Sequence, residues 1–232
     1  MAQQDERAAR APLSRERVLR TAVDLADEQG LDAVSMRRLA ERLGVVPMAL
    51  YKHVANKDQL LDGMVDLVVA GIAPPPKDAG WKDALRACVL AAREAMLRHP
   101  WARRVLEAQA APTPVLLAYT DATIAVLLRG GLSVDLVHHA MHALGSGAFG
   151  FSQELHQPGP GPAPAPSPSV AAQLAAAFPH VVAVATSRPH DAGSVVGAGC
   201  DDRFEFEFGL DLLLDGVERL HAAGWSSSAD AG

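Results

Sequence analysis

The sequence predicts an all-α protein, in which a small three-helix unit precedes a larger helical domain. Apolar residues recur at helical spacing over most of the 232 residues, and glycines and prolines divide these stretches into segments. The alternating pattern of a β-strand is nearly absent, apart from a short run at 181–185. A hydrophobic fraction of 49% and a net charge of −6 indicate a chain that buries a core, not a largely disordered one.

The first three helices are predicted from their end signals. Residues 1–13 are polar and aperiodic, which favours a flexible arm, and Ser14 is a good N-cap for a helix that stops at Gly30. Ser35 caps a second, short helix that ends at Gly44, and Pro47 stands at the first position of a third helix over 47–54. The third helix is expected to turn these residues inward: Leu50, Tyr51 and Val54.

Two short helices joined by a glycine-containing turn form a helix-turn-helix unit. Its second helix is presented to the major groove of DNA. Outward Pro47, Met48 and Ala49 are small or apolar enough to approach base edges. The neighbouring side chains that can donate hydrogen bonds to phosphates are Arg37, Arg38, Tyr51, Lys52, His53 and Lys57. Spacing alone leaves a plain three-helix bundle with a solvated basic face as the alternative.

The remainder of the chain is predicted to be helical too. Asn56 caps a long helix, and the Pro-rich stretch 157–169 is interpreted as a linker inside the second domain. The expected helices lie at 57–70, 81–98, 102–109, 114–129, 133–156, 170–186 and 202–222. The predicted organisation is an arm (1–13), a helix-turn-helix domain (14–61), a ligand-binding and dimerisation domain (62–225) and a tail (226–232).

Composition excludes several other classes of protein. Cys88 and Cys200 are too few for a disulfide framework or for a zinc site built on Cys pairs. No apolar run approaches the ~18 residues of a membrane span, and the N-terminus lacks the apolar core of a secretory signal. A soluble, cytoplasmic protein is therefore expected. Residues 1–57 hold ten Lys/Arg against eight Asp/Glu, whereas residues 58–232 hold eleven against nineteen, so the front is the more basic part.

The segment SMRRLAERLGVVPMALYKHVANKDQLL, residues 35–61, resembles the DNA-binding segment of the tetracycline-repressor (TetR) family of bacterial transcription regulators. The resemblance implies that Arg37 contacts a base edge, with guanine as the expected base, and that Pro47, Met48 and Ala49 line the major groove. It also implies that phosphates are held by Ser35, Tyr51, Lys52, His53 and Lys57. The sequence departs from the tetracycline repressor at Val46, Pro47, Met48 and Lys52, so the operator cannot be transferred.

Two later segments, 128–157 and 203–220, resemble the regulatory domain of the same family. This likeness implies a homodimer through the helices near 133–156 and 202–222, which would bind a pseudo-palindromic double-stranded operator. The apolar stripe at 206–220 fits this interface, although such a stripe fits ordinary core as well.

The family's effector pocket corresponds in this chain to Cys88, Ala92, Leu106, Gln109, Thr123, Ile124, His138, Met141, Ser146 and Glu154. In the tetracycline repressor, histidines stand where this chain has Leu106 and Ser146, so a tetracycline–magnesium chelate is not the expected effector. A bulky, largely hydrophobic small molecule fits the pocket better.

Some residues keep alternative interpretations. His138 and His142 share a helix face, as metal ligands do, but pocket lining, exposure or structural hydrogen bonding fit as well, and no metal or cofactor is predicted. Cys88 is either a redox sensor or inert core, and His99 and His156 are expected at the surface. Nucleophile-elbow, phosphate-loop and dinucleotide motifs are missing, so an enzyme is not expected.

The sequence therefore predicts a dimeric repressor that is released by its effector. A ligand- or partner-binding protein with a vestigial DNA-binding head is the alternative, and an activator or a broad, low-specificity DNA binder is a third possibility.

Overall fold

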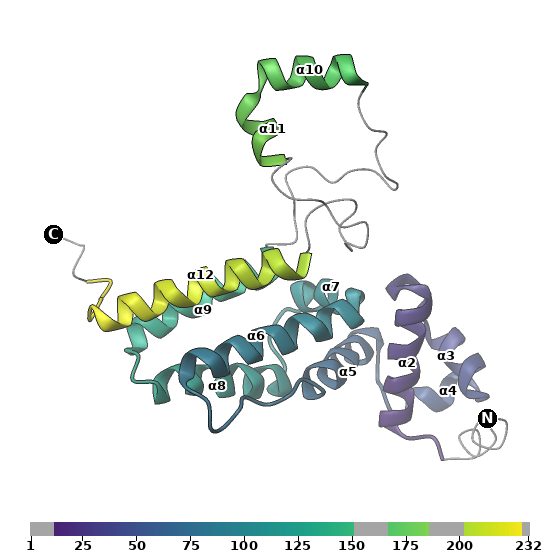
Figure 1. The fold of residues 1–232 in the computed structure, drawn as a ribbon. Coiled ribbons are helices and arrows are strands. Elements are labelled where there is room, and N and C mark those ends of the chain that lie inside the picture. Colours follow the sequence, from purple (N-terminus) through teal and green to yellow (C-terminus); the bar gives the residue numbers. More distant parts are fainter. Residues whose placement is uncertain (1–11, 151–166, 186–201, 229–232) are drawn as a thin grey trace. The chain divides into compact units, whose positions relative to one another are not determined.

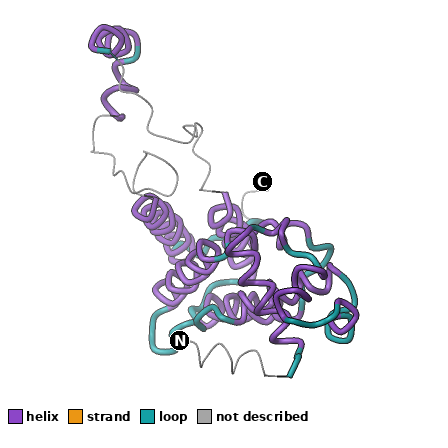
Figure 2. The backbone as a smooth tube through the Cα atoms, turned by 90° about the vertical axis from the view of Figure 1, so that its right-hand side faces the viewer, coloured by secondary structure: helices purple, strands orange, loops and turns teal. Residues whose placement is uncertain are grey.

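In the computed structural model, residues 12–150, 167–185 and 202–228 are described, and within these ranges every regular element is a helix (Figures 1 and 2). The all-α prediction is confirmed. The chain forms two compact units, residues 1–132 and 133–232, which are described separately. Over the described ranges, no helix combines the length and the apolarity that crossing a membrane requires.

The first unit begins with α2 (Arg15–Gln29), a 3₁₀ turn (Leu31–Ala33), α3 (Met36–Leu43), α4 (Pro47–Leu50) and α5 (Lys57–Ala70). The predicted caps are confirmed: Ser14 accepts from the backbone N–H of Arg17, Ser35 from that of Arg38, and Asn56 from that of Gln59. Each of these bonds satisfies a backbone donor that has no partner within its helix.

Three further helices belong to this unit: α6 (Trp81–Arg98), α7 (Pro100–Ala108) and α8 (Pro114–Arg129). Helix α7 begins two residues before its predicted start, because Pro100 occupies its first turn, where the missing N–H costs nothing. Figure 1 shows α3 and α4 on the side of α2 that faces away from α6 and α8. One hydrophobic core runs from α2 through α5 to α7, so the helix-turn-helix is built directly onto the helices that follow it.

Two glycines allow close approach inside this unit. A Cβ atom on Gly63 of α5 would lie 2.7 Å from a methyl carbon of Leu19 in α2. A Cβ atom on Gly130, just after α8, would lie 2.5 Å from both Cβ and Cγ of Trp81 at the start of α6. Neither distance is compatible with a side chain unless the neighbour moves.

The second unit contains α9 (Val134–Gly150), α10 (Pro168–Ala177), α11 (Pro179–Ala185) and α12 (Asp202–Ala222). Helices α9 and α12 lie side by side (Figure 1). Their buried residues are Leu136, Val137, Ala140 and Leu144 on α9 and Leu210, Leu214 and Val217 on α12. The segment after α12 folds back, because Ser227 donates to Asp135 through its backbone N–H (2.7 Å) and its hydroxyl (2.8 Å).

Several predictions for the elements are wrong. The single helix over 170–186 is two helices, because Pro179 has no N–H to continue α10 and instead starts α11. The run at 181–185 is helical, not a strand. The third helix stops at Leu50, not at residue 54, and Tyr51 is exposed instead of turned inward. Residues 151–166, which include most of the predicted linker and the end of the 133–156 helix, lie outside the described residues.

Candidate DNA-binding face and effector site

The turn between α3 and α4 presents the predicted DNA-contacting residues. Gly44 ends α3 in the left-handed region (φ 68°), which an L-residue rarely adopts, and the N–H of Val45 returns to the carbonyl of Ala40. Two fully buried residues, Leu50 and Val54, anchor the short helix α4 and the turn after it. The polypeptide can therefore expose the outer side of this turn without losing its attachment to the core.

The outer side of the turn is both apolar and exposed. The side chain of Met48 is 71% exposed and that of Val46 is 68% exposed. Large exposed apolar groups side by side commonly mark a binding surface. Around them, Ser35, Arg37, Arg38, Pro47, Tyr51, Lys52 and Lys57 are exposed, whereas Ala49 and His53 are half-buried. The structure therefore brings the predicted DNA-contacting residues together on one part of the first unit.

Polar contacts with α2 hold two arginines of α3. Arg42 grips Glu28 of α2 with both terminal nitrogens, and this hydrogen bonding lowers the pKa of the Glu28 carboxyl from its ordinary value. Arg38 donates to the amide oxygen of Gln29 over 3.2 Å. These two contacts brace α3 against α2. The spacing of residues along α3 does not predict these two contacts, because both partners lie on another helix, α2.

Arg37 has a different kind of partner. Its Nε donates to Oε1 of Glu41 over 3.0 Å, one turn further along the outer face of α3. The sequence prediction did not include Glu41, although an Arg–Glu pair at i,i+4 on a helix is a recognisable signal.

The first unit contains six of the residues predicted for the effector pocket. Cys88 on α6 and Thr123 on α8 are buried; Ala92, Leu106, Gln109 and Ile124 are half-buried. Tyr119 of α8 donates to the carbonyl oxygen of Cys88 over 3.3 Å, which joins two of these helices. Burial raises the pKa of Tyr119 to about 12. Burial also raises the pKa of the Cys88 thiol, and this favours inert core over a redox sensor.

Gln109 stands out among these residues. Its Nε2 donates to Asp62 of α5 over 2.8 Å, while its Oε1 is buried and has no hydrogen-bond partner in the described part of the chain. A buried acceptor without a donor is unfavourable by about 1–3 kcal/mol. Four residues later, Thr113 donates to Asp66 over 2.5 Å. The connection between α7 and α8 is thus bonded twice to α5, the helix that follows the α3–α4 turn.

The remaining pocket residues belong to the second unit. His138 is exposed, Met141 is half-buried, and Ser146 lies in α9 with a side chain outside the described set. Glu154 and His156 also lie outside the described residues. The ring centroids of His138 and His142 are 4.7 Å apart, and those of His138 and His139 are 5.1 Å apart. Within the described ranges, no group of three or more His, Cys, Asp or Glu residues is arranged to hold a metal ion.

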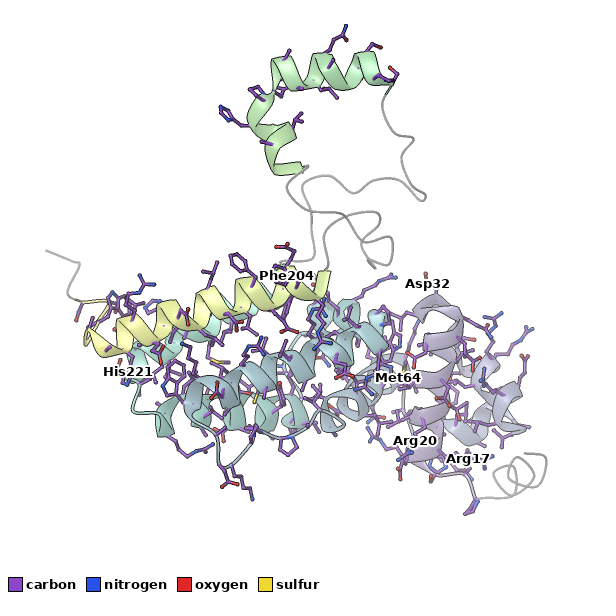
Figure 3. The ribbon with its side chains drawn as sticks, viewed as in Figure 1. Arg17, Arg20, Asp32, Met64, Phe204 and His221 are labelled. Carbon is purple, nitrogen blue, oxygen red and sulfur yellow. The ribbon has the colours of Figure 1, made fainter. Side chains whose placement is uncertain are left out.

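One prediction about the histidines is wrong. His99 is not a surface residue; it is half-buried, and its Nδ1 donates to Asp27 over 2.9 Å. It also lines a cleft of about 330 Å³ together with Arg20, Val23, Asp24, Leu67 and Val68. Figure 3 labels Arg17 and Arg20 on α2 and Met64 on α5, and the side chain of Met64 is fully buried.

The chain is similar to known proteins along most of its length. The family model described as "Bacterial regulatory proteins, tetR family" matches residues 18–64. The model described as "Tetracyclin repressor-like, C-terminal domain" matches residues 73–221. The two matched stretches correspond to α2–α5 and to the helices from α6 onward.

Curated proteins give the same picture. The class C tetracycline repressor protein of Escherichia coli is 29% identical over 211 residues, which cover 90% of this chain and 92% of that protein. The HTH-type transcriptional repressor DrrR1 of Streptomyces coeruleorubidus is 33% identical over 129 residues, 55% of this chain and 48% of that protein. An HTH-type transcriptional regulator of Saccharopolyspora erythraea is 32% identical over 51% of each chain. The chain thus spans about half the length of the latter two relatives.

Solved structures also match. ActR of Streptomyces coelicolor in complex with actinorhodin is 28% identical, with a TM-score of 0.66 over 90% of this chain and 98% of that chain. Apo ActR gives a TM-score of 0.68 at 27% identity, over 93% of this chain and 99% of that chain.

Proposed function

The chain belongs to the tetracycline-repressor (TetR) family, and on this premise we propose that it is a one-component transcriptional repressor released from DNA by a small, largely hydrophobic ligand. It binds a pseudo-palindromic operator as a homodimer. No residue is assigned a catalytic role, because the family consists of regulatory proteins.

The exposed apolar turn at α4 is the observation that carries the DNA-binding role. Met48 and its neighbours Pro47 and Ala49 lie against base edges in the major groove, where thymine methyl groups offer apolar contact. Arg37 contacts a guanine from the first turn of α3. Ser35, Arg38, Tyr51, Lys52, His53 and Lys57 fix the register by binding phosphates.

The outward face of α12 supports the homodimer. Its inner side packs on α9, yet Phe204, Phe208 and Leu212 are exposed at i, i+4 and i+8. The rings of Phe204 and Phe208 stack with centroids 6.4 Å apart (Phe204 is labelled in Figure 3). Three exposed large apolar residues along one helix form a patch that a second copy of α9 and α12 covers. Within one chain, the stripe predicted at 206–220 is buried at Leu210, Leu214 and Val217, so the dimer argument depends on the exposed residues of the other face.

The effector acts through α5. A hydrophobic molecule among α6, α7 and α8 contacts the apolar side chains of Ala92, Leu106 and Ile124, and a donor group on it satisfies the free Oε1 of Gln109. Because Gln109 is bonded to Asp62 and Thr113 to Asp66, a shift of the α7–α8 connection displaces α5. Ligand and operator then favour different conformations and weaken each other reciprocally. ActR, a relative of this chain, was solved with actinorhodin bound.

Selection of bound sequences from random DNA duplexes tests this function. Purified full-length protein at near-physiological salt should enrich a two-fold-symmetric motif. Replacing Arg37 with Ala should lower affinity for that motif by about 1–3 kcal/mol and relax one base preference, whereas replacing Lys57 with Ala should weaken all sequences similarly. Failure of a folded, dimeric sample to enrich any motif would contradict the proposal and favour a vestigial head. Strong salt dependence without a motif would favour a broad DNA binder.

A further inference from the structure

The ion pair between Arg37 and Glu41 lies on the exposed outer face of α3. We propose that Glu41 is a positioning residue that fits Arg37 for reading guanine, an inference that rests on the base-contacting role proposed above for Arg37. The two side chains are 85% and 61% exposed, so neither is held by the core. Their contact joins Nε of Arg37 to Oε1 of Glu41 at 3.0 Å.

Glu41 accepts from Nε of Arg37, and this choice of atom determines which nitrogens of the guanidinium can still bind a base. A guanidinium presents its donors as a planar fork, and guanine offers two acceptors, O6 and N7, to a bidentate partner. With Nε occupied by the carboxylate, the two terminal nitrogens of Arg37 remain for O6 and N7. The pair also restricts the rotation of a long side chain before DNA arrives, so that less conformational entropy is lost on binding.

Glu41 also changes which DNA groups attract Arg37. A carboxylate at hydrogen-bond distance offsets the charge of the guanidinium, which reduces its attraction to phosphates everywhere along a duplex. The hydrogen bonds of Arg37 to the neutral acceptors of guanine are weakened less by the charge of Glu41, because these bonds are directional and short-ranged. Glu41 therefore lowers affinity for any DNA while raising discrimination between sequences, and specificity is such a difference of affinities.

The other arginines of α3 are held differently. Arg38 donates to the neutral amide of Gln29. Arg42 donates to Glu28 of α2 through both terminal nitrogens, so these nitrogens are not available for a base. Arg37 is the arginine of α3 whose carboxylate partner lies on its own outer face and engages Nε. Arg103 and Glu107 of α7 form the same contact, Nε to Oε1 at 2.8 Å, outside the helix-turn-helix. They provide a matched control.

The experiment compares wild-type protein, Glu41→Gln, Glu107→Gln, Arg37→Ala and the double variant Arg37→Ala/Glu41→Gln. Each guanine of the selected operator is replaced in turn by adenine and by 7-deazaguanine, which lacks N7. Affinity for these duplexes and for a random duplex is measured at several salt concentrations. Thermal melting establishes that each variant is folded.

For wild type, replacing the contacted guanine should weaken binding about 5- to 150-fold, the value of a good bidentate contact. Glu41→Gln should reduce this ratio several-fold, bind random DNA more tightly and steepen the salt dependence. Glu107→Gln should leave the guanine ratio and random-duplex affinity unchanged. In the double variant, Glu41→Gln should cause no further loss of guanine discrimination, because the arginine that it positions is gone.

Three results would overturn the inference. In the first, replacing the contacted guanine weakens binding by Glu41→Gln as much as binding by wild type, while Arg37→Ala no longer distinguishes the two duplexes. In that case Glu41 does not position Arg37, and the proposed role of Arg37 still stands. If Glu41→Gln weakens all duplexes by the same factor, the residue is merely structural. If Arg37→Ala itself retains every guanine preference, or if no guanine is sensitive in wild type, the base-contacting role of Arg37 fails, and the inference fails with it.

Discussion

The indole N–H of Trp101 donates to Oδ1 of Asp27 over 2.6 Å, although the two residues are 74 positions apart in the chain. The same carboxylate accepts from His99, so one acidic residue of α2 holds both the turn before α7 and the first turn of α7 itself. This polar contact lies at the junction of α2 and α7.

Replacing Asp27 with Ala should destabilise the protein by about 1–3 kcal/mol, because the largely buried indole N–H of Trp101 then has no acceptor. Urea denaturation followed by circular dichroism measures the loss. Asp32→Ala is the control: this carboxylate is 91% exposed and pairs with Arg104 at 3.6 Å, so its removal should change stability by less than about 1 kcal/mol. Equal losses in the two variants would contradict the assigned importance of Asp27.

Replacing Gly130 with Ala should destabilise the protein by about 1–3 kcal/mol through overpacking, since the new methyl group meets Cβ and Cγ of Trp81. The backbone at Gly130 has a φ of −71°, which alanine adopts freely, so the effect is purely steric. The control is Gly80→Ala, because a Cβ at residue 80 has no atom within 4 Å. This substitution should leave the free energy of unfolding nearly unchanged in the same denaturation assay. An unchanged midpoint for Gly130→Ala would mean that α6 and α8 are more loosely packed than described.

The bond between Asp135 and Ser227 should make the attachment of the C-terminal segment to α9 sensitive to acid. The backbone and hydroxyl donors of Ser227 lower the pKa of Asp135 from its ordinary value of 3.8. A lowered pKa contributes stability that is complete above the ordinary value and is lost as the pH falls through the folded-state value.

The variant Asp135→Asn should therefore melt below wild type at pH 7, and the difference should close as the pH falls below about 4. Melting temperature measured at a series of pH values follows this change. Asp121→Asn, at an exposed position of α8, serves as the control. A difference that persists at low pH would show that the carboxylate charge is not what Ser227 stabilises.

Replacing Leu212 with Glu should shift the protein from dimer to monomer in analytical ultracentrifugation, because the side chain is 58% exposed in one chain and lies on the outward face of α12. A charge placed there opposes burial against a second copy. Leu117→Glu is a matched substitution on α8, 53% exposed, and should leave the dimer intact. A dimer of unchanged affinity in Leu212→Glu would remove this face from the proposed interface.

Local signals made much of the fold predictable. The caps Ser14, Ser35 and Asn56 and the left-handed Gly44 act within a few residues of themselves, so the sequence contains all the information that they need. The same is true of the outward Pro47 and Met48, because a helix period defines the face opposite Leu50. The predicted DNA-contacting residues follow from these local rules together with the resemblance to a family.

Contacts that depend on tertiary structure were not predictable in this way. Periodicity shows that a residue faces inward but does not identify its partner, so the bonds of Asp27 to His99 and of Asp62 to Gln109 were missed. The sequence predicts an inward Tyr51 on a helix that runs to residue 54, whereas α4 ends at Leu50 and Tyr51 is exposed. The second apolar face of α12 was overlooked because one stripe already accounted for the helix.

The close approach of Gly63 to Leu19 has a mechanical consequence. No side chain lies between the backbone of α5 and the side chain of Leu19, so no rotamer change at residue 63 can absorb a shift between α5 and α2. A shift of α5 toward α2 at this point must therefore be taken up by the side chain of Leu19, whose methyl groups are the closest atoms.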